Sequence, residues 1–138
     1  MQFREATESD LRIVSKDSIS RGCREFPEAI DLVYALEHDD IVLGVGGLKL
    51  MNEHTAWVWM DMHVEARKHI KLIIRLLKRF LDGFASKRGI TRLMAAVDVD
   101  FPEAIRTVEH LGFHRESRMK AYNGDTDAFL YVKLSEVK

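Results

Sequence analysis

The stretch that decides the fold of this chain is Met62-His63-Val64-Glu65-Ala66-Arg67-Lys68-His69-Ile70-Lys71-Leu72. Just before it, residues 57–62 include two tryptophans and a valine, which favours a strand. Beyond its midpoint, apolar residues recur at three- and four-residue steps, the period of an amphipathic helix: Ile70, Ile73, Ile74, Leu77, Phe80, Leu81 and Phe84. The sequence therefore predicts a strand that runs directly into a long helix.

The bulk composition is that of a soluble globular protein, with 46% hydrophobic and 31% charged residues. We expect one domain spanning residues 1–138, because this length can bury a core without disulfides or metal. The net charge of −1 gives no general attraction to nucleic acid or anionic lipid. The single cysteine, Cys23, cannot form an intrachain disulfide or a metal-binding cysteine cluster. Without a signal peptide or membrane-length apolar run, we expect a cytoplasmic protein.

Caps and turn residues divide the rest of the chain into strands and helices. Thr7-Glu8-Ser9-Asp10 suits the start of a helix, Pro27 and Pro102 suit first turns, and Gly89 and Gly112 suit helix ends. The predicted strands are 3–6, 32–37, 41–51, 57–62, 93–99, 115–122 and 128–134. Four helices are predicted: one after Thr7, one that begins near residue 26, one that begins near residue 70, and one that spans about 101–111. This order predicts a mixed sheet with helices on its faces.

The chain resembles the GNAT superfamily of acetyl-CoA-dependent N-acetyltransferases from Phe3 to Leu134. The resemblance is most specific at Arg4-Glu5-Ala6-Thr7-Glu8-Ser9-Asp10, at Leu43-Gly44-Val45-Gly46-Gly47, and from Ala104-Ile105 to Leu111-Gly112-Phe113. It implies an α/β (α+β) fold with a mixed, mostly antiparallel sheet of six to seven strands and about four flanking helices. It also implies acyl transfer from acetyl-CoA to an amine.

In that family the strand-to-helix loop has the form Val-x-Pro-Glu-x-Arg-x-x-Gly-x-Gly, and its backbone N–H groups hold the CoA pyrophosphate. Here Ile70 and Leu72 occupy the two glycine positions, where branched side chains obstruct a close approach of the ligand. Either the basic side chains of the loop bind phosphate instead, or they form the solvated face of a helix. The resemblance implies that acetyl-CoA would lie against Met62, His63, Val64, Arg67, Lys68, His69, Ile70, Lys71 and Leu72.

The acid and base positions also depart from the family pattern. Phe101 and Val108 stand where many members have Asn and a proton-donating Tyr, and neither side chain can transfer a proton. Strand alternation puts Trp57, Trp59, Asp61 and His63 on one face, so Asp61 or His63 is a candidate general base if that face borders the substrate. Otherwise both are surface or hydrogen-bonded structural groups. Tyr122 is a further catalytic candidate, with packing against the sheet as its alternative.

Two functions are therefore compatible with the sequence. The first is a GNAT-like N-acetyltransferase with lost or weakened activity, acting on a small-molecule or protein amine. The second is a non-catalytic structural or interaction protein; short divergent GNAT-like proteins of tailed phages, including internal virion proteins, resemble this chain in size. In that case it would lie in the host cytoplasm or the virion. A protein partner could bind the basic helix 67–79, a homodimer is a further alternative, and nucleic acid is the least expected partner.

Overall fold

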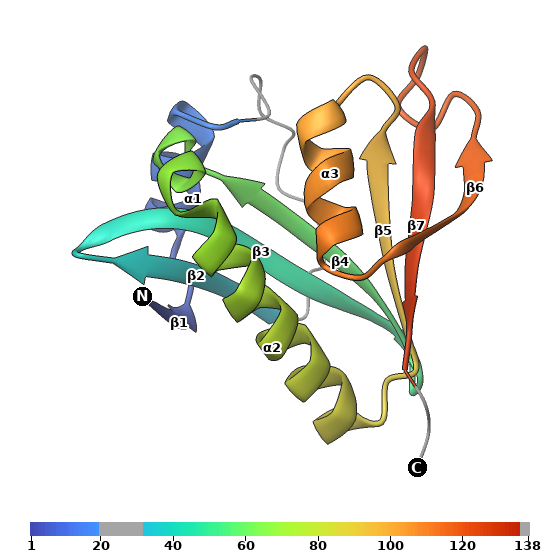
Figure 1. Ribbon diagram of the computed structural model, residues 1–138, viewed down its shortest axis with the longest axis horizontal. Coiled ribbons are helices and arrows are strands. Elements are labelled where there is room, and N and C mark those ends of the chain that lie inside the picture. Colours follow the sequence, from blue (N-terminus) through green and yellow to red (C-terminus); the bar gives the residue numbers. More distant parts are fainter. Residues whose placement is uncertain (20–31, 136–138) are drawn as a thin grey trace. The chain divides into compact units, whose positions relative to one another are not determined.

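The computed structural model describes residues 1–19 and 32–135, which contain seven strands, three α-helices and one 3₁₀ helix (Figure 1). The elements are β1 (Gln2–Glu5), α1 (Glu8–Lys16), β2 (Leu32–His38), β3 (Ile41–Asn52), β4 (Thr55–Met62), η1 (Val64–His69), α2 (Ile70–Arg88), β5 (Arg92–Asp98), α3 (Pro102–His110), β6 (His114–Met119) and β7 (Ala128–Leu134). The predicted strand and long helix are both present, but they are not joined directly, because the 3₁₀ helix η1 lies between them. The helix predicted near 26–30 and Cys23 lie outside the described residues.

The seven strands form one sheet in the order β1-β2-β3-β4-β5-β7-β6. β4 and β5 pair in parallel through Thr55–Arg92, Ala56–Leu93 and Trp57–Met94, whereas β1/β2, β2/β3, β5/β7 and β6/β7 are antiparallel. The predicted mixed, mostly antiparallel sheet is thus confirmed. The chain forms two compact units, Met1–Lys49 with Val58–Ile70 and Leu50–Trp57 with Lys71–Lys138. No helix in the described residues is long and apolar enough to cross a membrane.

In the first unit, α1 packs on β2 and β3 through a small apolar cluster formed by Val14, Ala35, Val42 and Val45. Thr7 caps α1 as predicted, since its side chain accepts the backbone N–H of Asp10. The Asp10 carboxylate in turn accepts the backbone N–H of Thr7, which completes a capping box. Trp59 of β4 packs against the same cluster, which places this tryptophan on the α1 side of its strand.

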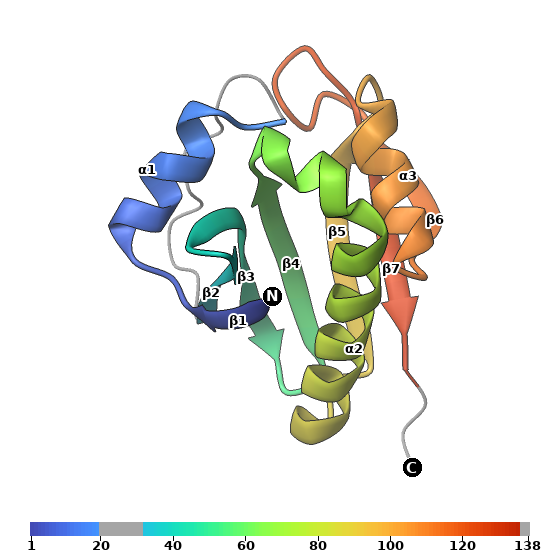
Figure 2. The same ribbon diagram turned by 60° about the vertical axis from the view of Figure 1, so that its left-hand side comes forward.

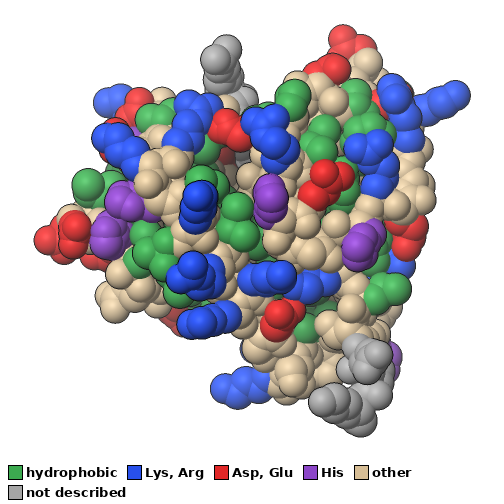
Figure 3. Space-filling view, viewed as in Figure 1, with side chains coloured by type: hydrophobic (Ala, Val, Ile, Leu, Met, Phe, Trp, Pro, Cys, Tyr) green, Lys and Arg blue, Asp and Glu red, His purple; other side chains and the backbone are tan. Residues whose placement is uncertain are grey.

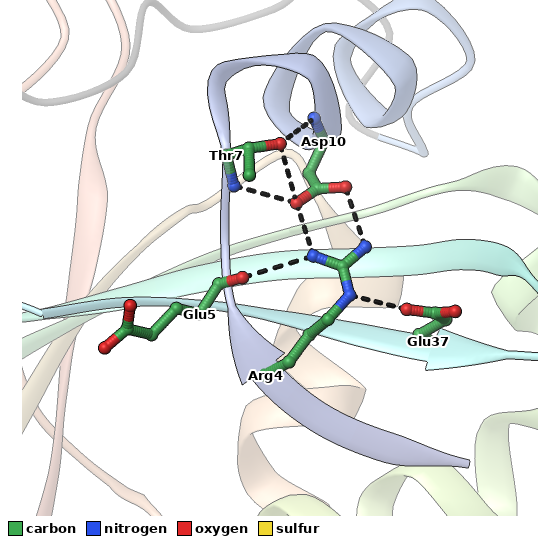
Figure 4. Close-up of polar contacts among 5 residues, drawn as sticks. All are labelled: Arg4, Glu5, Thr7, Asp10 and Glu37. Carbon is green, nitrogen blue, oxygen red and sulfur yellow. Dashed lines mark hydrogen bonds and ion pairs between the residues drawn. The ribbon is translucent and has the colours of Figure 1, made fainter.

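A network around Arg4 ties α1 to the strands of the first unit (Figure 4). The guanidinium donates two hydrogen bonds to the Asp10 carboxylate, at 2.7 and 2.9 Å, and a third to Glu37 of β2. These contacts, above all the hydrogen bonds from Arg4, lower the pKa of Asp10 to about 2. The segment that carries part of the resemblance therefore fixes β1, α1 and β2 to one another.

Two glycines of β3 allow close contact with β4. A Cβ atom on Gly46 would lie 2.9 Å from the carbonyl oxygen of Trp59, and one on Gly44 would lie 3.2 Å from that of Asp61. Real Cβ atoms essentially never approach backbone to under 3.0 Å. The glycines at 44 and 46 are thus explained by strand packing.

In the second unit, α3 lies against β5 and β7 (Figure 1). The hydroxyl of Tyr131, a fully buried residue, donates to Glu109 of α3 at 2.9 Å. Lys133 donates to the carbonyl of Leu111 at 3.0 Å and so stabilises the end of the helix. Gly89 and Gly112 follow α2 and α3 with φ angles of +68° and +95°, as expected for glycine caps.

The predicted strand 115–122 is too long, because β6 ends at Met119. The chain turns at Ala121, whose φ is +52° and whose N–H donates to the Asp127 carboxylate at 2.8 Å. Tyr122 consequently lies in the β6–β7 loop and is 48% exposed, instead of packing against the sheet.

Candidate functional site

The two edges of β4 differ at its C-terminal end. The N–H of His63 donates to the carbonyl of Leu43 in β3 at 2.9 Å. Because successive residues of an extended chain direct their backbone polar groups to opposite edges, Met62 and Val64 present theirs to the edge away from β3. This edge, at residues 62–64, is where the resemblance places an acyl-CoA, and we call it the β4 edge.

The chain itself already occupies the β4 edge (Figure 2). The N–H of Ile19 donates to the carbonyl of Met62, and the N–H of Val64 donates to the carbonyl of Asp17, both at 2.9 Å. Together these bonds make an antiparallel bridge between Ser18 and His63. The short segment after α1 therefore adds a minimal strand to β4.

Asp61 reinforces the same contact. Its Oδ1 atom accepts the hydroxyl of Ser18, a buried residue, at 2.5 Å and the N–H of Met62 at 2.9 Å. Both backbone polar groups of Met62 are consequently engaged within the first unit. Asp61 is thus hydrogen-bonded on the α1 side of β4, and its role as a general base stays a prediction.

His63 caps η1. Its Nδ1 atom accepts the N–H of Glu65 at 3.1 Å, and its carbonyl accepts the N–H of Ala66 at 2.9 Å. The N–H groups of a helix's first turn are the ones that bind anions. Since Val64, Glu65 and Ala66 all donate to acceptors of this chain, the start of η1 offers a phosphate few open backbone donors. The other ring nitrogen, Nε2, lies 3.5 Å from the Asp17 carboxylate.

The two glycine positions of the family loop lie at the start of α2. Ile70 has helical backbone angles, φ −59° and ψ −37°, so the chain passes from η1 into α2 at this residue. Leu72 is 39% exposed, which leaves an apolar side chain on the surface. At both positions where the resemblance places a glycine, this chain therefore has helix with a branched side chain.

The basic residues near this turn have different surroundings. Lys68 pairs with Glu65 at 2.8 Å, which lowers the pKa of the Glu65 carboxyl, and the ring of His69 packs edge-on against His38 at 5.0 Å. Farther along, Lys and Arg side chains gather over α2 (Figure 3). Among the exposed cations of this helix, Lys71, Arg75, Lys78 and Arg79 have no ion-pair partner within residues 1–19 and 32–135.

The remaining predicted positions lie in the second unit. Phe101 precedes α3 without a side-chain cap, Val108 is buried at 6% exposure, and Tyr122 is on the β6–β7 loop. Asp61 and His63 are instead brought together with Asp17 and Ser18 in the first unit. Sequence reasoning missed Asp17 and Ser18, because no local pattern marks a bridge across 45 positions. In the described part of the chain no three His, Cys, Asp or Glu residues are grouped to hold a metal.

Comparison with known proteins identifies the fold. No protein-family model matches the sequence, and no curated protein matches it. Among solved structures, the ribosomal-protein-S18-alanine N-acetyltransferase from Escherichia coli matches with a TM-score of 0.76 and 18% identity, over 99% of this chain and 96% of that one. A variant of the spermidine N-acetyltransferase SpeG from Vibrio cholerae matches with a TM-score of 0.78 and 17% identity, over 97% and 95% of the two chains.

A third match, smu.2055 from Streptococcus mutans UA159, has a TM-score of 0.74 and 16% identity over 97% of this chain and 99% of that one. These similarities extend over nearly the whole length of each protein. The chain has the GNAT fold of N-acetyltransferases.

Proposed function

We propose that this chain is a GNAT-type acyltransferase that transfers an acetyl group from acetyl-CoA to an amine. The observation that carries the proposal is the similarity to two N-acetyltransferases, which extends over 95% or more of each of those two chains. A fold alone accommodates many activities, so the residues of the β4 edge and η1 must supply the chemistry.

The reaction requires two proton movements. The amine nitrogen forms a bond to the acetyl carbonyl carbon, the carbon–sulfur bond breaks, and CoA leaves as a thiolate that takes up a proton. The amine gives up one proton, for which Asp61 or His63 is the acceptor, directly or through water, and Tyr122 is the third candidate. Phe101 and Val108 cannot supply the proton to the thiolate, so water must do so. Catalysis then depends mainly on proximity, and we expect it to be slow.

For the phosphates of an acyl-CoA, the basic side chains near the start of α2 are better binding groups than the backbone N–H groups of η1. The N–H groups of Val64, Glu65 and Ala66 are engaged, whereas Arg67, Lys68 and Lys71 place exposed cations near the helix start. Charge-assisted bonds from such cations to phosphate are strong. We propose that these three side chains and His69 bind the phosphates, that Ile70 and Leu72 contact the ligand's apolar parts, and that the β4 edge takes the pantetheine.

The acceptor is an amine. Spermidine and the alanine of a ribosomal protein are the acceptors named for the two similar enzymes, and they share only an amino group. We therefore propose the class, a small-molecule or protein amine, without choosing within it.

A second candidate function is a non-catalytic interaction protein, for example an internal virion protein of a phage. The observation in its favour is the row of unpaired cations on α2. Lys71, Arg75 and Arg79 lie four residues apart on one helix face, where like charges repel by about 0.2–0.5 kcal/mol per pair. An acidic protein surface would relieve this repulsion. The exposed Leu72 beside them suits a protein better than a nucleic acid.

Thermal unfolding with and without acetyl-CoA tests the two functions. Roughly 1 mM ligand should raise the melting temperature of the natural chain, because a ligand bound only to the folded state stabilises it. Arg67→Ala and Lys71→Ala should lose most of this shift, whereas Arg12→Ala, an exposed cation on α1, should keep it. If neither the natural chain nor the double variant Ile70→Gly/Leu72→Gly responds, the result counts against phosphate binding at this helix start and favours the interaction protein over the acyltransferase.

A further inference from the structure

We infer that residues 17–19 form an internal strap that competes with acyl-CoA for the β4 edge; this inference rests on the proposed function. The strap pairs with β4 through the N–H of Ile19 and the carbonyl of Asp17. The N–H of Ile19 donates to the carbonyl of Met62, and the carbonyl of Asp17 accepts the N–H of Val64. Acyl-CoA can reach the same two backbone groups only after the strap has moved away.

The chemistry of the ligand makes the competition direct. The pantetheine arm is an extended chain with two amide groups, each carrying one N–H donor and one carbonyl acceptor. An extended amide chain binds a strand edge through main-chain hydrogen bonds, as an added peptide strand does. The strap uses one donor and one acceptor in this way at Met62 and Val64. Since each of these β4 groups already has its partner, strap and ligand exclude one another.

A side-chain contact keeps the strap in place. Ser18 is buried, and its hydroxyl donates to Asp61 at 2.5 Å. The same carboxylate oxygen accepts the N–H of Met62, the remaining backbone polar group of that residue. Asp61 therefore acts here as a latch that links the strap to β4. For this Asp61 oxygen to take a proton from an amine, its hydrogen bond with the Ser18 hydroxyl would first have to break.

The strap is also small enough to be displaced. It contributes a single bridge, Ser18 with His63, instead of a ladder. One bridge with two backbone bonds and one side-chain bond opens far more easily than a core strand. Because the strap must move before acyl-CoA binds, the apparent affinity is lowered in proportion to the fraction of molecules in which the edge is open. The strap thus provides autoinhibition, which a partner that draws the end of α1 away would relieve.

Two variants weaken the strap by different means. Ile19→Pro removes the N–H that bonds to Met62, and proline favours an extended conformation of the residue before it, which is compatible with the β-bridge of Ser18. Ser18→Ala removes the hydroxyl that bonds to Asp61. Each should lower the calorimetric dissociation constant of acetyl-CoA by about threefold to tenfold. Ser9→Ala, on the exposed surface of α1, is the matched control and should bind like the natural chain.

Amide hydrogen exchange supplies a readout independent of activity. Without ligand, the N–H groups of Ile19 and Val64 should exchange slowly. With acetyl-CoA, Ile19 should become fast while Val64 stays slow, because the ligand replaces the strap as acceptor for Val64. Binding that leaves Ile19 protected and both variants unchanged would overturn the strap and leave the proposed function standing. Binding to neither the natural chain nor the variants would overturn both, and binding to the variants alone would support both.

Discussion

The hydroxyl of Ser18 donates to the carboxylate of Asp61 at 2.5 Å, which joins the chain just after α1 to the end of β4. Hydrogen bonds to a charged group contribute about 1.5–3 kcal/mol. We expect Ser18→Ala to lower the free energy of unfolding in urea at pH 7 by about that amount. Ser9→Ala should change it by less than about 0.5 kcal/mol. Equal values for the two variants would show that the bond contributes nothing.

The cap on η1 should contribute measurably to stability. His63→Ala removes the acceptor for the Glu65 N–H, and losing a helix cap costs about 1 kcal/mol. His63→Asn should retain most of this stability, because asparagine is a good N-cap. His110→Ala, on the exposed side of α3, controls for the loss of a histidine. A denaturation midpoint for His63→Asn as low as that for His63→Ala would contradict the capping role.

Two glycine-to-alanine changes should have opposite signs. Gly46→Ala places a Cβ 2.9 Å from the carbonyl oxygen of Trp59, so we expect a loss of about 1–3 kcal/mol in unfolding free energy. Gly83→Ala lies within α2 with no neighbouring atom within 4 Å of the new Cβ. It should stabilise by about 0.5–1 kcal/mol, since alanine is the better helix former. A neutral Gly46→Ala would mean that β3 and β4 are less tightly packed than described.

The Arg4–Asp10 contact should make stability depend on acid pH. Arg4 holds the pKa of Asp10 at about 2 in the folded state, below its ordinary 3.8. A group with a lowered folded pKa stabilises above its unfolded pKa, and this contribution is lost as the pH falls from about 4 to 2. The difference corresponds to about 2 kcal/mol.

Unfolding free energies measured from pH 5 to pH 2 test this prediction. Asp10→Asn should be less stable than the natural chain at pH 5 and should show a flatter decline toward pH 2. Asp39→Asn serves as the control, because the Asp39 side chain is 85% exposed. Parallel pH profiles for the natural chain and Asp10→Asn would contradict the lowered pKa.

Local patterns were sufficient to predict most of the fold. The helical period after Ile70, the cap at Thr7 and the glycines at 89 and 112 are signals within a few residues, and each marks a real boundary. The strand ending at Met119 was predicted too long, since the turn depends on Asp127 bonding to Ala121 across the loop. The strand propensities of the individual residues carry no information about such a bond.

The candidate site was less predictable. The branched residues at 70 and 72, which stand where the resemblance places glycines, lie in helix; their effect on ligand binding stays a prediction. The closing of the β4 edge was not foreseen, because it pairs Asp17 and Ile19 with Val64 and Met62 by backbone alone. Backbone pairing between distant segments leaves no signature in side-chain types. Only the arrangement in space shows that Asp61 and Ser18 form one contact.

The most direct test of the central claim, acyl transfer to an amine, is mass spectrometry of products. The purified chain would be incubated with acetyl-CoA and a set of amines that includes polyamines and peptides with free N-termini. We predict one acetylated amine per CoA released, at a rate that rises with protein concentration and is higher for Ile19→Pro. No acetylated product above the protein-free rate, for either the natural chain or this variant, would contradict the claim.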